Sequence, residues 1–114
     1  MTLGMDDIAG YRRALQDELA VLATEDAATS QDRGAVTLDQ QSVGRLSRMD
    51  AMQMQAMAQA TARRRAARGA RINAALKRMN EGEFGYCQDC GDEIGQKRLD
   101  LDATVPTCVS CAKG

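Results

Sequence analysis

Apolar residues recur at helical spacing near the start of the chain. Between residues 6 and 24 they stand three or four positions apart and would share one face of a helix: Ile8, Tyr11, Leu15, Leu19 and Leu22. Asp6 and Asp7 precede this stripe, where they can cap a helix and favour its positive end. The pattern therefore predicts an amphipathic helix over about residues 6–24.

A second, longer helix is predicted to end near Asn80, with two alternative starts. Thr37 and Ser47 each open a capping-box pattern, in which a hydroxyl accepts an unpaired backbone N–H at the helix start. No proline interrupts the chain between either start and Asn80. The residues expected on its apolar face are Leu46, Met49, Met57 and Ala60, followed by Ile72, Leu76 and Met79.

The methionines of this helix have two interpretations. Because methionine is flexible and fills irregular gaps, we interpret Met49, Met52, Met54 and Met57 as adaptable packing. The alternative is a partner-binding patch, because Met52 points away from the face of Leu46. The two interpretations differ in whether these side chains are buried.

Together the two helices predict an all-α fold. Residues 25–36 are small and polar without a period, so we expect them to form a loop. Helices joined by a short loop pack antiparallel, as a helical hairpin or coiled coil. We therefore expect this hairpin over residues 1–80, and a small metal-binding module over residues 81–114, where glycines and paired cysteines gather.

Composition excludes several classes of function. Only 3% of the residues are aromatic, and histidine is absent, which removes Ser-His-Asp and Cys-His catalysis and histidine-containing zinc sites. No apolar run approaches the roughly 20 residues of a membrane span. The first residues carry acids where a secretory signal carries bases. We therefore expect a cytoplasmic protein.

Charge is segregated along the chain, although the net charge is only −1. Residues 63–80 hold seven bases and no acid, whereas residues 1–30 and 81–114 each have a net charge of −4. The basic segment can pair internally with the acidic amino-terminal segment. Alternatively, it can dock an anionic partner or ligand.

Four cysteines form the one strong chemical motif. Cys87, Cys90, Cys108 and Cys111 follow the pattern C-x2-C-x17-C-x2-C, which is typical of a tetrahedral zinc site. Two such turns can face each other across a single ion. A site closed by four thiolates leaves no position for a catalytic water, so we expect one structural Zn2+ that stabilises the module.

The sequence around the cysteines resembles the DksA/TraR family of zinc proteins over residues 83–111. The matching motif is E-F-G-Y-C-x2-C-G-x-E-I-G-x-K-R-L-x6-P-x-C-x2-C. The resemblance implies a transcription regulator that binds bacterial RNA polymerase directly, without binding DNA. In that family a coiled-coil hairpin enters the secondary channel of the polymerase, and its acidic tip acts near the catalytic centre to change initiation.

The predicted hairpin tip differs from that of the family. The family's acidic motif, Asp-x-x-Asp-x-Ala, does not occur in this chain. We expect the partner-binding tip residues near the start of the second helix instead: Arg45, Arg48 and Asp50. The alternative is that these side chains only cap and solvate that helix.

A basic face is predicted farther along the second helix. Arg64, Arg68 and Arg71 recur at intervals of four and three, so they line one side of it and could contact an acidic channel rim. Arg71 also matches a lysine of the family's nucleotide site. Asp102 replaces an arginine of that site and Ala112 a lysine, which makes the binding of guanosine tetraphosphate doubtful.

Other functions have less support in the sequence. The main alternative is a zinc-stabilised module that binds another protein. Direct nucleic-acid binding is favoured only by residues 63–80 and is opposed by both acidic flanks. An enzyme is not expected, because no nucleophile–base pair or open metal site is evident. We expect a monomer.

Overall fold

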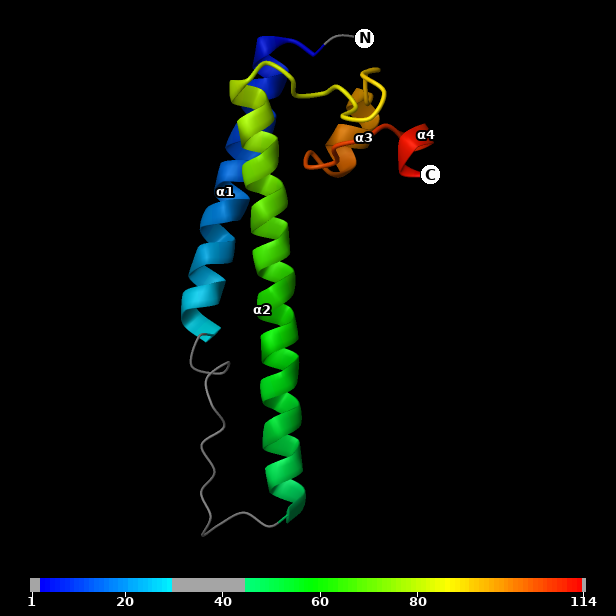
Figure 1. Cartoon of the computed structure of the whole chain (residues 1–114). Coiled ribbons are helices and arrows are strands. Elements are labelled where there is room, and N and C mark those ends of the chain that lie inside the picture. The colour runs from blue at the N-terminus through cyan, green and yellow to red at the C-terminus, as the bar shows by residue number, and fades with distance from the viewer. Residues whose placement is uncertain (1–2, 30–44, 114) are drawn as a thin grey trace. The chain divides into compact units, whose positions relative to one another are not determined.

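The computed structural model describes residues 3–29 and 45–113, with side chains from residue 48 onward in the second segment. Its helices are α1 (Met5–Thr29), α2 (Arg45–Asn80), α3 (Gln96–Leu101) and α4 (Val109–Ala112), as Figure 1 shows. Within the described segments, the only extended pairing is an isolated bridge between Tyr86 and Glu93. The all-α prediction is confirmed. No described helix is long and apolar enough to cross a membrane.

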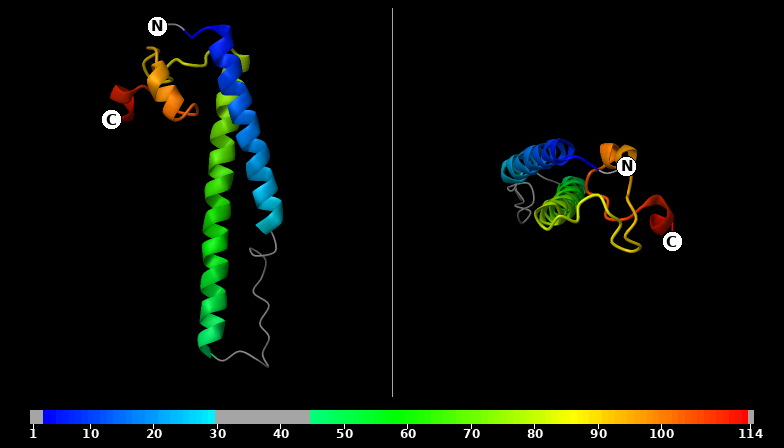
Figure 2. Two further views of the ribbon diagram at one scale, coloured as in Figure 1. Left: turned by 180° about the vertical axis from the view of Figure 1, so that it is seen from behind. Right: turned by 90° about the horizontal axis from the view of Figure 1, so that it is seen from above.

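The chain packs as two compact units. One unit comprises Met1–Ala20 and Gly69–Gly114, and the other comprises Val21–Arg68. Within each unit a part of α1 runs antiparallel beside a part of α2, as two of the views show (Figures 1 and 2), so the predicted hairpin pairing is confirmed. The domain division at residue 80 stays a prediction.

The core lies in the first unit. Its buried apolar side chains come from α1, from the end of α2 and from the segment after it: Leu15, Ile72, Ala75, Met79, Phe84, Cys87, Ile94 and Leu99. The aromatic rings of Tyr11 and Phe84 meet with their centroids 5.7 Å apart. The carboxyl-terminal segment therefore folds onto the helices of its own unit.

The first helix begins as the sequence predicts but ends later. At its start the Gly4 N–H donates to the Asp7 carboxylate over 3.1 Å, which satisfies one unpaired backbone donor. The predicted apolar stripe lies on the packed side, where Leu15 is buried and the others are half-buried: Ile8, Tyr11, Leu19 and Leu22. The helix continues to Thr29 rather than ending near residue 24.

The added turn of α1 depends on a contact with α2. Arg65 donates to the Thr29 hydroxyl over 2.7 Å and lies 3.6 Å from the Asp26 carboxylate. The Thr29 hydroxyl in turn donates to the Glu25 carbonyl over 2.9 Å. The predicted loop is therefore wrong over residues 25–29. Apolar periodicity does not reveal this extension, because polar contacts within the folded unit stabilise it.

The packed face of α2 has mostly small residues in its first part, up to Gly69, and large apolar residues near its end. The less exposed positions recur at intervals of three and four: Ala51, Gln55, Ala58, Ala62, Arg65, Gly69, Ile72, Leu76 and Met79. The prediction for Ile72, Leu76 and Met79 is confirmed. Small side chains let two helix backbones approach closely, so this face needs few large residues.

The predicted methionine packing is wrong. Met49 and Met57 are 60% and 68% exposed, and Met52 and Met54 are exposed as well. The packed positions begin at Ala51, two residues after Met49, and two residues correspond to about 200° around a helix. Met49 therefore lies on nearly the opposite face of α2 from Ala51. The Leu46 side chain and the alternative start at Thr37 lie outside the described part of the chain.

A glycine ends α2 and turns the chain toward the cysteines. Gly82 has a φ of 75°, which favours glycine, and its N–H donates to the Met79 carbonyl over 3.3 Å. The Glu83 N–H donates to the Arg78 carbonyl over 2.9 Å. These two bonds form a Schellman motif, which satisfies carbonyls at the helix end.

Candidate metal centre

The first cysteine pair lies on a tight backbone loop. The Cys87 N–H donates to the Asp92 carbonyl over 2.7 Å, and the Gly91 N–H donates to the Cys87 carbonyl over 2.9 Å. Gly91 has a φ of 81°, which residues with a side chain rarely adopt. The loop therefore turns back on itself and brings Cys87 and Cys90 to one side.

The second cysteine pair lies at a short helix. Cys108 is the residue before α4, and its carbonyl accepts the Ala112 N–H over 2.9 Å, so Cys111 lies within the same turn. The Gln88 N–H donates to the Pro106 carbonyl over 2.8 Å. This bond joins the first loop to the segment that precedes Cys108.

The four sulfur atoms form one cluster of zinc-binding dimensions. The Sγ atoms of Cys87, Cys90, Cys108 and Cys111 all lie within 4.8 Å of one another. Those of Cys90 and Cys108 are 3.7 Å apart. Tetrahedral Zn–S bonds of about 2.3 Å place sulfurs roughly 3.8 Å apart, so the cluster fits one Zn2+. Since four protein ligands complete that coordination, the metal is structural.

The protonation of the thiols also favours a cation. Burial raises the pKa of Cys87, but hydrogen bonds from the backbone of Cys108, Cys90 and Asp89 outweigh it and lower that pKa to about 6. The pKa of Cys111 is raised, first by its hydrogen bond with Cys87 and then by those with Cys108 and Cys90. Neighbouring thiolates repel one another, so zinc must displace protons to bind all four.

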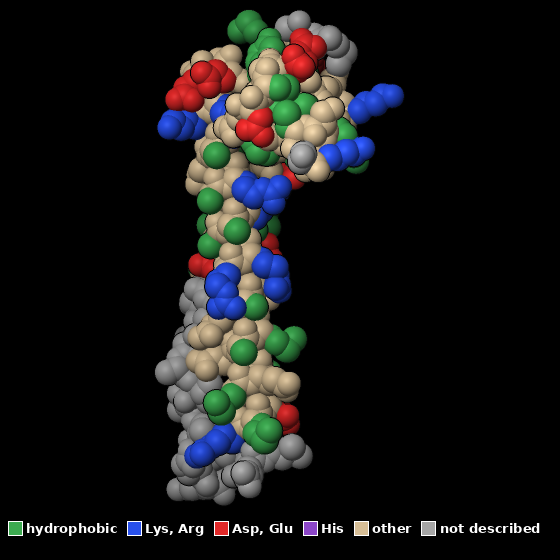
Figure 3. Space-filling model, turned by 45° about the vertical axis from the view of Figure 1, so that its right-hand side comes forward, with side chains coloured by type: hydrophobic (Ala, Val, Ile, Leu, Met, Phe, Trp, Pro, Cys, Tyr) green, Lys and Arg blue, Asp and Glu red, His purple; other side chains and the backbone are tan. Residues whose placement is uncertain are grey.

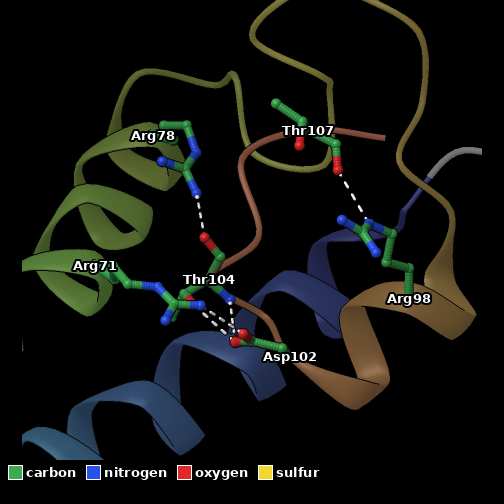
Figure 4. A network of polar contacts seen from close by, with 6 residues as sticks. All are labelled: Arg71, Arg78, Arg98, Asp102, Thr104 and Thr107. Atoms are coloured by element: carbon green, nitrogen blue, oxygen red, sulfur yellow. Dashed lines mark hydrogen bonds and ion pairs between the residues drawn. The ribbon is translucent and has the colours of Figure 1, made fainter. Parts of the chain in front are cut away.

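Three arginines hold the loop that leads into the second cysteine pair (Figure 4). Arg71 pairs with the Asp102 carboxylate over 2.8 Å, and Arg78 donates to the Thr104 carbonyl over 3.3 Å. The same Asp102 carboxylate accepts the Thr104 N–H over 3.0 Å and its hydroxyl over 2.7 Å. The end of α2 is therefore bonded to both ends of this turn.

The third arginine comes from α3. Arg98 donates its Nε–H to the Thr107 carbonyl over 3.0 Å, immediately before Cys108. On the same helix, the carboxylate of Asp100 accepts the Tyr11 hydroxyl over 2.5 Å. Burial, followed by this hydrogen bond and the nearby charge of Asp100, raises the pKa of Tyr11 to about 12. Thus α3 is bonded both to α1 and to the metal-binding loop.

The predicted partner-binding residues lie in different surroundings. Arg48 and Asp50 are exposed on α2, whereas the Arg45 side chain lies outside the described residues. Arg64 is exposed and donates to the Thr61 hydroxyl over 2.9 Å. Figure 3 shows basic side chains (blue) along the surface on the face that it draws.

Two bases of the predicted helix face have internal contacts. Arg71 is 54% exposed, but it is paired with Asp102. Arg68 is half-buried and interacts within the described part of the chain. The predicted role of this face in binding is untested.

Two of the residues that support the metal site have no strong signal in the sequence. Arg78 and Thr104 are buried, and neither type of residue signals burial in a sequence. The spacing of Asp102 and Thr104 is a usable signal, because an aspartate often accepts the N–H two residues on. Arg78 also lies one position from the predicted core residue Met79, at the end of an apolar stretch.

The carboxyl-terminal segment is similar in sequence to known proteins. Residues 82–114 match the family described as the prokaryotic dksA/traR C4-type zinc finger. The RNA polymerase-binding transcription factor DksA of Haemophilus influenzae is 44% identical over 41 residues, which are 36% of this chain and 28% of that protein. The DksA of Escherichia coli K12 is 42% identical over 41 residues, which are 36% of this chain and 27% of that protein.

The fold as a whole also has a solved counterpart. The structure of transcription factor DksA2 from Pseudomonas aeruginosa is similar with a TM-score of 0.79, over 97% of this chain and 84% of that one, at 18% identity. At that identity the similarity shows the fold alone. The sequence resemblance is confirmed where the residues match: residues 82–114 match the dksA/traR C4-type zinc finger, and the four cysteines of this segment are placed to hold one metal ion.

Proposed function

We propose that this protein binds bacterial RNA polymerase and regulates the initiation of transcription. The observation that carries the proposal is the 42–44% identity of its zinc finger to proteins named RNA polymerase-binding transcription factor DksA. Those matches span little more than a quarter of the relatives' length, so the likeness in fold to DksA2 supplies the second support.

The proposed docking site is the secondary channel of the polymerase. A helical hairpin with exposed charged side chains, Arg48 and Asp50, suits entry into a narrow channel. Arg64 and Arg68 are the proposed contacts with an acidic rim. Arg71 contributes less to this surface, because its charge is balanced by Asp102.

The proposal includes no direct binding to DNA. Of the seven bases in residues 63–80, Arg65, Arg71 and Arg78 make contacts inside the protein. The flanking segments are acidic, and a duplex would repel them. We also propose that guanosine tetraphosphate does not bind at Arg71, because the Arg71 guanidinium is already paired with the Asp102 carboxylate. The curated relatives are named as transcription factors, and we propose no catalytic activity.

A pull-down with purified core RNA polymerase tests the proposal. We propose that the protein is cytoplasmic and monomeric, and size-exclusion chromatography tests the monomer. We expect the zinc-loaded protein to retain core polymerase in the absence of DNA. Duplex DNA alone should give no salt-dependent mobility shift. If the protein fails to retain core polymerase, the alternative of a zinc-stabilised module for another protein replaces the proposal.

A further inference from the structure

Arg78 is a buried guanidinium without an acidic partner. Its side chain is only 6% exposed at the end of α2, and burial lowers its pKa from the ordinary arginine value. Among the described residues, the hydrogen bond of its guanidinium goes to a neutral acceptor, the Thr104 carbonyl, over 3.3 Å. No ion pair of Arg78 is present among residues 3–29 and 45–113.

Such a charge needs compensation. Removing a cation from water is costly unless an opposite charge lies near it, and a single neutral hydrogen bond offsets only part of that cost. Arg71, by contrast, is more exposed and has Asp102 as its partner. The arginine with the greater need for an anion is therefore the one that lacks a carboxylate.

The metal centre is a source of negative charge in the same part of the fold as Arg78. Four thiolates around one Zn2+ carry a net charge of −2. Arg78 and the buried ligand Cys87 line the same cavity of about 500 Å3, together with Gly82, Glu83, Tyr86 and Gln88. Glu83 also lines this cavity, but it is exposed to water and makes no ion pair with Arg78 in the described structure.

The hydrogen bonds of this region join Arg78 to the loop that leads into the second cysteine pair. Its guanidinium donates to Thr104, four residues before Cys108, and Gln88 next to Cys87 donates to Pro106 of the same loop. The guanidinium is thus bonded to the loop that joins both cysteine pairs.

We propose that Arg78 is the internal counter-charge of the zinc–tetrathiolate centre and a positioning residue for its second cysteine pair. The coupling is reciprocal. Arg78 stabilises the negatively charged zinc complex, and the zinc complex compensates the buried cation. Without zinc the tetrathiolate complex is absent, and Arg78 then stays buried without that counter-charge.

Zinc affinity in variants of the full chain tests this assignment. The zinc-loaded parent, Arg78→Met, Arg78→Lys and Lys97→Met are titrated with a chromophoric chelator at pH 7.5. Groups that support metal ligands typically change metal affinity by about 10–100-fold, and we expect a loss in that range for Arg78→Met. Arg78→Lys should lose less, because it keeps the charge. Lys97→Met removes one exposed positive charge from the same segment and should match the parent.

A second measurement separates charge compensation from packing. Urea unfolding of each variant is followed with zinc and with excess chelator. We expect Arg78→Met to lower the unfolding midpoint in zinc and to leave it unchanged or higher in chelator, since it removes an uncompensated charge. Parent-like zinc affinity of Arg78→Met would overturn the proposal. Equal losses for the lysine and methionine variants, an equal loss for Lys97→Met, or equal destabilisation with and without zinc would also overturn it.

Discussion

Each cysteine of the centre contributes one thiolate, and the two pairs reach the metal from separate backbone loops. Replacing Cys108 with serine removes a sulfur that lies 3.7 Å from that of Cys90. We expect the purified parent to hold one zinc per chain by elemental analysis and Cys108→Ser to hold none. Because Phe84, Ile94 and Leu99 are buried in the same unit, residues 83–111 should loosen along with the nearby helix ends.

Circular dichroism and limited proteolysis check the structural part of this prediction. The variant should keep part of its helix signal, because Val21–Arg68 form a separate compact unit. Cleavage should appear first within residues 83–111. Carefully prepared parent protein without zinc, or with a disulfide between Cys87 and Cys90, would contradict the assignment of the metal.

Tyr11 connects α1 to α3 through a bond that depends on pH. The pKa of Tyr11 rises from 10.0 to about 12 in the fold, so folding favours its protonated hydroxyl. The stabilisation is therefore complete below pH 10 and is lost as the pH rises through about 12. We expect Tyr11→Phe to lower the free energy of unfolding by about 0.5–1.5 kcal/mol at pH 7, the usual contribution of one hydrogen bond.

Urea titrations of the parent and Tyr11→Phe at several pH values between 7 and 12 measure this difference. It should be constant up to about pH 10 and should then shrink. The ring contact with Phe84 survives in the variant and serves as an internal control. A difference that grows above pH 10 would show that the hydroxyl is not held as a donor to Asp100.

At the scale of helices and loops, the features that depend on residues close together in the sequence were predicted better than those that depend on contacts between helices. The apolar stripe around Leu15 and the spacing of the cysteines both depend on residues close together in sequence, and both predictions are confirmed. In the first half of α2 the predicted packed face is wrong, because alanines carry little hydrophobic signal beside Met49 and Met57. The last turn of α1 depends on Arg65, which is 36 positions away from Thr29. Contacts of that range leave no local period.

The basic face of α2 yields a prediction about docking. Arg64 is exposed, and Arg68, one turn farther on, is half-buried. Arginines clustered at a surface can steer and hold an acidic surface. We expect the double variant Arg64→Glu, Arg68→Glu to bind core RNA polymerase at least tenfold more weakly than the parent, with unchanged helix content. Fluorescence anisotropy at two salt concentrations measures the affinity and its electrostatic part.

Arg71 provides the matched comparison on the same face. Arg71→Glu breaks the pair with Asp102 and places two carboxylates together, so it should loosen the loop before Cys108 as well. A loss of affinity in Arg71→Glu therefore has to be compared with the loss of stability of the same variant. If the double variant at positions 64 and 68 binds like the parent, this face takes no part in docking.

At the scale of the molecule, the two compact units suggest different tasks. The unit with the zinc finger holds the buried core, whereas Val21–Arg68 contain no buried apolar side chain among their described residues. A helical segment that is polar on most of its surface and carries exposed methionines is suited to contact a partner. On the proposed function, we therefore expect the first unit to form the stable base and the second to contact the partner.

This division predicts that substitutions at the start of α2 change the effect on initiation without changing the affinity for polymerase. Arg48 and Asp50 are exposed, so neither fills a core. Arg48→Ala and Asp50→Ala should each bind core polymerase within about twofold of the parent, because a surface charge far from the main contact contributes little affinity. Each should nevertheless change the effect on initiation, because under the proposed function the start of α2 enters the polymerase channel and the docking contacts lie farther along the helix.

In vitro transcription from a responsive promoter, at saturating protein, measures the effect apart from the affinity. Met54→Ala is the matched control, because it removes an exposed side chain from the same helix without changing the charge. Because the motif Asp-x-x-Asp-x-Ala is absent, the parent should not substitute fully for a family member that carries it. If both charge variants act like the parent, the start of α2 performs no regulatory step, and the protein acts by occupying its docking site.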